Sequence, residues 1–258
     1  MKFSKLSSIL AALTLSMAAS SASALVVTAN NNATALANAL GGSGVSISNA
    51  TFLSTASSTA TGTFTGGADS VGFASGVLLT TGTVNCAPGP NTSANCGDTS
   101  GTTTSLKFDF TSDTGNVYFK YVFASEEYNE WVGSQFNDQF ELRLNGVNVA
   151  LLPGAGGVVS INNVNNGSNA AYYRDNTVLG LDLGYDGLTT VLVAQATGIT
   201  GTNTFEFLIK DLGDFALDSG VFIEAGTFSG TNPVPEPTGL ALFGLGLLGL
   251  LAAKRKKA

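Results

Sequence analysis

The sequence predicts an all-β fold, an antiparallel β-sandwich or jelly roll with one short helix near its N-terminus. Short segments of alternating apolar and polar residues recur along the chain. Glycine and asparagine separate these segments, and the 258 residues include 32 glycines. With 44% hydrophobic and 9% aromatic residues the chain can bury a sizeable core. Because all-β domains of roughly 200–250 residues are common, we expect one main domain, residues 25–232.

The first 24 residues are expected to be a secretory signal peptide. Lys2 and Lys5 give a basic start, residues 9–19 are mostly apolar or small, and Ala22-Ser23-Ala24 supplies the small residues of a cleavage site. A membrane anchor is the alternative, but the apolar run is shorter than the roughly 20 residues that a span needs. We therefore expect export through the Sec pathway and cleavage after Ala24.

We call the expected domain, residues 25–232, the body. Its N-terminal half is expected to begin with a helix and to continue in strands. Residues 30–40 have alanine and leucine at helical spacing, and Gly41-Gly42 would stop the helix. The predicted strands are residues 44–52, at most one short strand within 55–67, residues 76–81, and the alternating segment of Leu106, Phe108 and Phe110.

The segment Tyr118–Asn145 is the centre of the prediction. It reads as two strands, one with Phe119 and Phe123 on a common face and one running from Phe136 to Leu144, separated by an acidic and aromatic loop. We interpret it as a hairpin-like unit whose loop is held by a rigid sheet, where binding residues often lie. Asn145-Gly146 is the kind of pair that forms a tight two-residue turn. The remaining predicted strands are residues 147–151, 158–163, 188–197, 203–210 and 220–228, with a polar loop at 165–176 and an acidic loop at 211–219.

The charge of the body is strongly negative. The whole chain carries a net charge of −7, but the two ends contain six of its eleven basic residues and only one of its eighteen acidic residues. The remaining body therefore has five basic and seventeen acidic residues, a net charge of −12. Such a surface repels nucleic acid and anionic lipid and suits divalent cations. Solubility alone would also account for many of these acids.

The cysteine and histidine content excludes several kinds of site. Cys86 and Cys96 lie in one Pro/Gly/Asn-rich loop, and in an exported protein a local disulfide between them is the default expectation. The sequence contains no histidine. Ser-His and Cys-His nucleophile pairs and histidine-based zinc sites are therefore excluded.

Clustered acidic residues predict a calcium site. Calcium prefers several carboxylate and carbonyl oxygens, which acidic loops at strand ends can supply. The candidate ligands are Glu126, Glu127, Asp138, Asp211, Asp214 and Asp218. Their spacing matches no strict calcium motif, and acids of this kind also cap turns. Asp182 and Asp186, with Gly184 between them, are a second and poorer candidate.

Two further hypotheses concern carbohydrate. Glu126, Glu127 and Asp138 could in principle form the paired carboxylates of a glycoside hydrolase, but adjacent residues of an extended chain point to opposite faces. The aromatic side chains of the two polar loops could instead form a platform on which a glycan stacks, since these rings have an apolar face. This platform would consist of Tyr128, Trp131, Tyr172 and Tyr173. The alternative is that Trp131 belongs to the core and the tyrosines pack within loops.

Residues 233–258 have three parts in order. Pro235-Glu236-Pro237 comes first, an apolar stretch predicted to be a transmembrane helix over about residues 239–253 follows, and Lys254-Arg255-Lys256-Lys257 comes last. This segment resembles the PEP-CTERM sorting signal. The resemblance implies that an exosortase-type enzyme recognises Pro235, Glu236 and Pro237. It also implies transient anchoring in the inner membrane, removal of the tail, and delivery to the surface or extracellular matrix of a Gram-negative bacterium.

The body also resembles a known family. The segments YVFASEEYNEWVGSQFNDQFELRLNG, VSINNVNNGSN, LDLGYDGLTTVLVAQA and DLGDFALDSGVFIEAG together are similar to the choice-of-anchor L domain. The resemblance covers most of residues 60–228 and implies a β-rich extracellular module without an assigned reaction. We therefore expect a surface or matrix protein that is not an enzyme and contributes to the exopolysaccharide matrix or to adhesion. A carbohydrate-binding module is the alternative, and a glycoside hydrolase is a more distant one.

Overall fold

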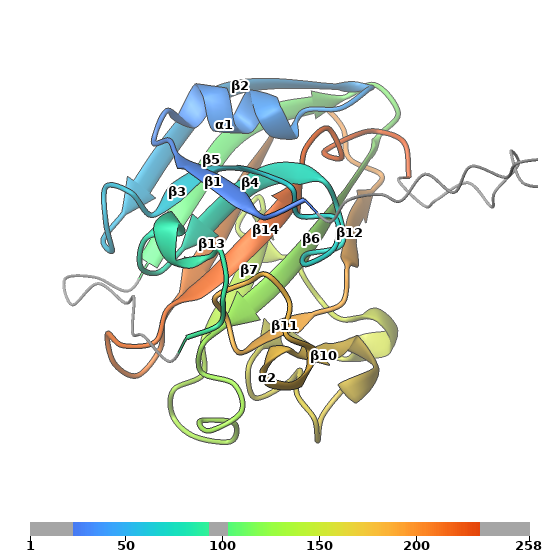
Figure 1. Cartoon of the computed structure of the whole chain (residues 1–258). Coiled ribbons are helices and arrows are strands. Elements are labelled where there is room, and N and C mark those ends of the chain that lie inside the picture. Colours follow the sequence, from blue (N-terminus) through green and yellow to red (C-terminus); the bar gives the residue numbers. More distant parts are fainter. Residues whose placement is uncertain (1–22, 93–102, 233–258) are drawn as a thin grey trace, which may run out of the picture.

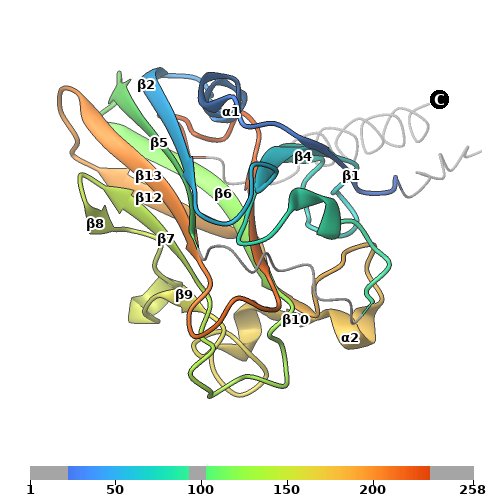
Figure 2. The ribbon, with the colours of Figure 1, turned by 90° about the vertical axis from the view of Figure 1, so that its left-hand side faces the viewer.

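The computed structural model describes residues 23–92 and 103–232. Two antiparallel β-sheets pack face to face in this part of the chain, and Figures 1 and 2 show them from two sides. The prediction of an all-β sandwich is confirmed. The two apolar clusters of the described part are built from residues between Leu25 and Phe228.

The larger sheet has eight strands. Its order is β1 (Val26–Ala29), β3 (Thr61–Thr65), β4 (Ser75–Thr80), β14 (Ser219–Glu224), β6 (Asn116–Ser125), β11 (Gly187–Thr189) and β10 (Tyr173–Asp175), and β12 (Leu192–Thr197) also pairs with β6. Strands β11 and β12 both pair with β6, β11 at its C-terminal end and β12 along the rest. Strand β1 pairs only with β3 and is therefore an edge of the sheet.

The smaller sheet has six strands. Its order is β2 (Val45–Ser54), β5 (Thr103–Ser112), β13 (Asn203–Lys210), β7 (Gln139–Leu144) and β8 (Val147–Asn148), and β9 (Val159–Ser160) also pairs with β7. The predicted turn joins β7 to β8, with positive φ angles of 50° at Asn145 and 87° at Gly146. Both angles suit the tight hairpin turn for which asparagine and glycine are preferred.

Phenylalanine rings fill the space between the sheets. The fully buried rings of the two facing layers are Phe108, Phe110, Phe119, Phe140, Phe205 and Phe207. Phe228 meets Phe108 edge-on, with ring centroids 5.1 Å apart, which is a favourable geometry for aromatic pairs. The alternation that predicted strand β5 places Phe108 and Phe110 in this core, as expected.

A second apolar cluster covers the outer face of the larger sheet. Phe64, Val122 and Phe222 point away from the first core and pack against side chains of loops, among them Leu183 and Tyr185. Strands β6 and β14 are therefore buried on both faces. Since such strands are apolar on both sides, β14 has no clean alternation in the sequence.

The predicted helix is present as α1 (Ala33–Leu40). Asn32 caps its first turn by accepting a hydrogen bond from the Ala35 amide at 3.0 Å, and Gly41 ends it. Leu36 and Leu40 are buried, so α1 closes one end of the sandwich (Figure 2). The other helices of the described part are α2 (Asn176–Leu179) and three short 3₁₀ turns at Val84–Cys86, Pro153–Ala155 and Ala170–Tyr172.

The prediction of a hairpin-like unit at Tyr118–Asn145 is wrong. Strand β6 belongs to the larger sheet and β7 to the smaller one, so the segment between them crosses from one sheet to the other. Strand β7 also begins at Gln139 rather than Phe136, because Phe136 and Asp138 belong to the crossing loop. The predicted strand at 188–197 is split into β11 and β12, and the predicted loop at 165–176 contains β10.

Several predictions concern residues outside the described part. The signal peptide except Ser23 and Ala24, the tail with its predicted span, and Cys96 lie there. The disulfide between Cys86 and Cys96 therefore stays a prediction. No helix within residues 23–92 and 103–232 is long and apolar enough to cross a membrane.

Candidate functional site: a buried carboxylate cluster

Two loops meet at the end of the sandwich opposite α1. One connects β6 to β7 and the other connects β13 to β14, and both views show them at the same end (Figures 1 and 2). The Asn137 amide donates to the Leu212 carbonyl at 3.2 Å, and Gly213 lies directly against Phe136. The crossing between the sheets thus brings together the acidic residues of two loops that are about 80 positions apart.

Asp138 lies at the centre of this contact and is fully buried. Its Oδ1 accepts a hydrogen bond from the Leu212 amide at 2.9 Å, and its Oδ2 accepts one from the Ser219 hydroxyl at 2.7 Å. Burial raises the pKa of Asp138 to about 7, although these two hydrogen bonds act in the opposite direction. Asp138 therefore ties the start of β7 to both ends of the other loop.

Asp218 is fully buried, and neither of its carboxylate oxygens makes a hydrogen bond of ordinary geometry. Burial raises its pKa to about 7, and the negative charge of Asp211 adds to the effect. The preceding residue, Leu217, has a φ angle of 62°, in the left-handed region that non-glycine residues seldom adopt. The chain thus directs an unpaired carboxylate into the interior at some conformational cost.

Glu126 and Glu127 are both buried but face different neighbours. Burial raises the pKa of Glu126 to about 9, with further contributions from Asp218 and Asp186. Burial raises the pKa of Glu127 to about 8, with contributions from Asp138, Asp214 and Asp211 among others. The prediction that adjacent glutamates would not face each other agrees with these different partners.

The loop between β13 and β14 completes the cluster. Asp211 is buried, and burial followed by the charges of Asp138 and Asp214 raises its pKa to about 8. Asp214 is partly exposed and its Oδ1 accepts a hydrogen bond from the Ala216 amide at 3.2 Å. We call the six predicted ligands the carboxylate cluster: Glu126, Glu127, Asp138, Asp211, Asp214 and Asp218.

The basic side chains of the described residues do not neutralise this cluster. Lys210 and Arg143 pair with Glu141, and Lys120 pairs with Glu224 at 3.2 Å. Arg174 donates to the Ser70 carbonyl oxygen at 2.9 Å, and Lys107 lies opposite Glu206 in the sheet. As the side chains stand, no three of the described acidic residues converge closely enough to hold a metal ion. The buried members of the cluster therefore owe their raised pKa values first to burial and then to the charges of neighbouring acids.

Asp182 and Asp186, the poorer calcium candidate, have different surroundings in the structure. Asp186 lies near Glu126, and its Oδ1 accepts a hydrogen bond from the Asn91 side chain at 2.7 Å. Burial raises the pKa of Asp186. Glu126 also lines a pocket of about 230 Å³ formed with the segment 85–92. Asp182 instead accepts a hydrogen bond from the Leu25 amide. No local pattern in the sequence indicates that Asp186 and Glu126 are neighbours in the fold.

The predicted aromatic platform needs correction at Tyr128. This ring is fully buried against Tyr173, with centroids 4.8 Å apart, so a glycan has no exposed face of Tyr128 to contact. Trp131 is 42% exposed and meets Phe136 edge-on at 5.0 Å. Tyr172 and Tyr173 are half-buried. Phe215, which was not among the predicted residues, is 49% exposed in the acidic loop. The position of Phe215 after Asp214 in a polar loop is the sequence signal that could have indicated its exposure.

Comparison with known families agrees with the sequence. Residues 233–256 match the PEP-CTERM protein-sorting motif, which indicates export and sorting to the cell surface in Gram-negative bacteria and processing by an exosortase-type system. Curated proteins and solved structures give no significant match. Residues 26–229, nearly the whole described body, match the choice-of-anchor L domain. The chain therefore belongs to the choice-of-anchor L domain family and is an exported, surface-sorted protein.

Proposed function

We propose that the body is a non-catalytic module of the cell surface or extracellular matrix. Calcium bound in the carboxylate cluster would brace the end of the sandwich by holding together the loops that connect β6 to β7 and β13 to β14. The observation that carries this proposal is the cluster itself, with five buried acids and no described basic partner. An exosortase-type enzyme would process the tail after export through the Sec pathway and transient anchoring in the inner membrane. The matrix role follows from the sorting signal and the acidic body.

The energetic argument starts from the cost of ionising these acids. Glu127 illustrates the cost, since its pKa rises from 4.5 to about 8. Each tenfold change in an ionisation equilibrium corresponds to about 1.4 kcal/mol, so charging Glu127 inside the fold costs several kcal/mol. Such a cost is large beside the roughly 5–15 kcal/mol by which most domains are stable. The raised pKa values therefore favour bound protons or a bound cation in the cluster at neutral pH.

A divalent cation fits the chemistry of the cluster. Calcium takes six to eight oxygen ligands in flexible arrangements, and carboxylates and loop carbonyls are its usual ligands. The charge of Asp138 adds to the effect of burial on the pKa of both Glu127 and Asp211, and neither carboxylate oxygen of Asp218 makes a hydrogen bond of ordinary geometry. Binding would draw these side chains together from their present positions. Most of these acidic residues lie in loops rather than strands, so small loop movements would be enough to bring their carboxylates together.

Limited proteolysis tests the bracing directly. Glu130 is exposed in the crossing loop, and a glutamate-specific protease can cut the bond between Glu130 and Trp131. We expect calcium to slow this cleavage several-fold relative to chelator, because bracing suppresses local opening of the loop. The fragment that begins at Trp131 is quantified by mass spectrometry. Asp218→Asn is the control and should be cut equally fast in both buffers. Calcium-independent cleavage of the wild type would argue against bracing.

A carbohydrate-binding module is the second candidate, favoured by the exposure of Trp131 and Phe215 beside the cluster. Stacking of sugar rings on exposed aromatic faces is a common use of tryptophan. If this holds, the body should sediment with isolated exopolysaccharide, and Trp131→Ala should lower the bound fraction by tenfold or more. Val178→Ala is the matched control, because Val178 is 80% exposed on α2, outside the aromatic loops. Equal binding by wild type and Trp131→Ala would sink the carbohydrate hypothesis.

A further inference from the structure

The first residue of the body makes tertiary contacts with the folded domain. Leu25, the residue that follows the predicted cleavage position, is only 4% exposed and packs into the cluster on the outer face of the larger sheet. Its backbone nitrogen donates a hydrogen bond to Oδ2 of Asp182 at 2.8 Å. These two residues are 157 positions apart, so the contact is a tertiary one. Strand β1 begins at the next residue.

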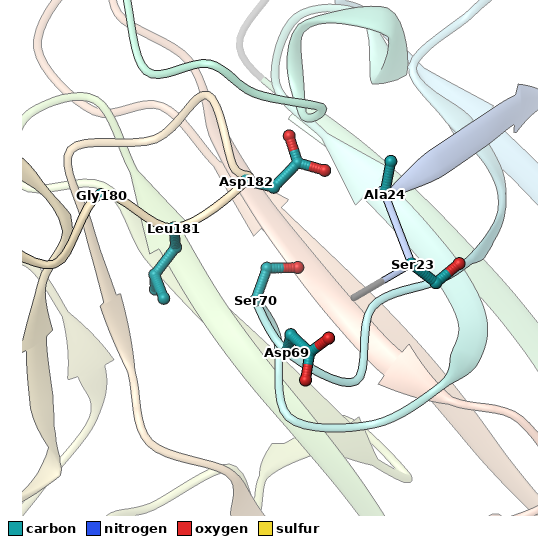
Figure 3. Close-up of a pocket in the computed structure, with 7 residues that line it drawn as sticks. All are labelled: Ser23, Ala24, Asp69, Ser70, Gly180, Leu181 and Asp182. Carbon is teal, nitrogen blue, oxygen red and sulfur yellow. The ribbon is translucent and has the colours of Figure 1, made fainter. Parts of the chain in front are cut away.

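A pocket of about 460 Å³ surrounds this contact. Its described lining consists of Ser23, Ala24, Asp69, Ser70, Gly180, Leu181 and Asp182, which Figure 3 shows around the opening. Cleavage after Ala24 would remove Ser23 and Ala24, and of the five lining residues that remain two are acids and none is basic. The guanidinium of Arg174 donates a hydrogen bond to the carbonyl oxygen of Ser70 at 2.9 Å. The Ser70 hydroxyl is buried without a hydrogen-bond partner.

We propose that signal-peptide cleavage places the new α-ammonium group of Leu25 on the carboxylate of Asp182, so that the processed N-terminus itself fastens strand β1 to the domain. Hydrolysis of the bond between Ala24 and Leu25 converts one amide N–H into an ammonium group with three N–H donors. One donor keeps the bond to Asp182, which becomes charge-assisted and therefore stronger. The other two become available on the side that Ala24 leaves, next to a pocket whose lining includes Asp69 and Ser70, whose hydroxyl has no hydrogen-bond partner.

The position of β1 gives this contact a function. Because β1 is an edge strand, hydrogen bonds to β3 alone hold it in the sheet. Edge strands are prone to pairing with other chains. Anchoring of the N-terminus keeps β1 paired with β3 and so disfavours pairing with another chain. Processing and completion of the fold are thereby coupled. The proposal rests on cleavage after Ala24 and is independent of calcium.

The reactivity of the Leu25 α-amine tests this proposal. The full precursor is expressed with its own signal peptide in a Gram-negative host, and the exported protein is treated with an acylating reagent at pH 7. Only the neutral amine reacts, and an ordinary α-amino group has a pKa of about 7.7–8.0. We expect acylation of the wild type to be about tenfold slower than that of Asp182→Asn. The asparagine keeps the size and the hydrogen-bond acceptor and removes only the charge.

Two further variants distinguish the effect of the Asp182 charge on acylation from the effect of burial of the Leu25 amine. Insertion of one alanine between Ala24 and Leu25 moves the ammonium group out of its site and should restore fast acylation. Asp113→Asn removes an exposed acid outside the site, keeps the pair with Asp182 and should stay slow. Equal rates for the wild type and Asp182→Asn would overturn the proposal. An exported protein whose N-terminal sequence begins at any residue other than Leu25 would overturn it as well.

Discussion

In the presence of chelator, the body is expected to be most stable near pH 4 and to lose several kcal/mol of unfolding free energy as the pH rises to about 8.5. The cause is the group of buried acids whose pKa values lie between about 7 and 9 in the fold. In the unfolded chain these acids titrate near pH 4. Between the two ranges the folded state binds more protons than the unfolded state. Stability therefore falls with rising pH throughout this window.

The acidic limb of the same profile has a different origin. Glu141 is partly buried, which opposes ionisation, but Lys210 and Arg143 lower its pKa below the ordinary value. Hydrogen bonds from Asn49 and Thr204 lower the pKa of Asp109. The contributions of these lowered acids are present above the unfolded pKa and are lost as the pH falls through the folded pKa. The profile should therefore have a maximum rather than rise continuously toward acid.

Urea denaturation at pH 5.5, 7.0 and 8.5 in chelator measures this effect. Glu127→Gln removes one raised acid and should flatten the alkaline limb, whereas Asp113→Asn should leave it unchanged. Asp113 is a suitable control because it lies exposed near the turn between β5 and β6. A wild-type profile that is flat between pH 5.5 and 8.5 would mean that the acids are ionised in the fold without penalty.

The sequence predicted the elements of the fold better than their arrangement. Strands β5 and β13 and helix α1 were predictable because alternation, helical spacing and an Asn/Gly boundary are local signals. The assignment of β6 and β7 to different sheets was not predictable, since two consecutive apolar-patterned strands fit a hairpin equally well. The decisive feature is long-range: β6 pairs with β14 and β7 pairs with β13, both far along the chain.

The candidate site was predictable in its residue types and not in its energetics. Acids at strand ends suggested the carboxylate cluster, and the fold places its members around the contact between the two loops. The sequence could not indicate that Asp218 is buried without hydrogen bonds, because burial arises from packing of distant segments. The same holds for Tyr128, where an aromatic residue in an acidic loop suggested exposure and the ring lies in the core.

Calcium should reverse the loss of stability at alkaline pH, which is the second large effect. A ligand that binds only the folded state stabilises it by about 2.7 kcal/mol at a hundredfold excess over its Kd. For a domain of this size that corresponds to a rise in melting temperature of roughly 5–10 °C. The rise should be larger at pH 8 than at pH 5.5, since protons compete with calcium for the carboxylates. Asp218→Asn and Asp138→Asn should abolish it, and Asp113→Asn should retain it.

The most direct measurement is a calorimetric titration of calcium into residues 25–232 at pH 8, after removal of bound metal with chelator. The account predicts saturable binding with a defined stoichiometry, lost in Asp218→Asn and kept in Asp113→Asn. Absence of binding by the wild type at millimolar calcium, together with an unchanged melting temperature, would contradict it. The carboxylate cluster would then be held at neutral pH by protons alone.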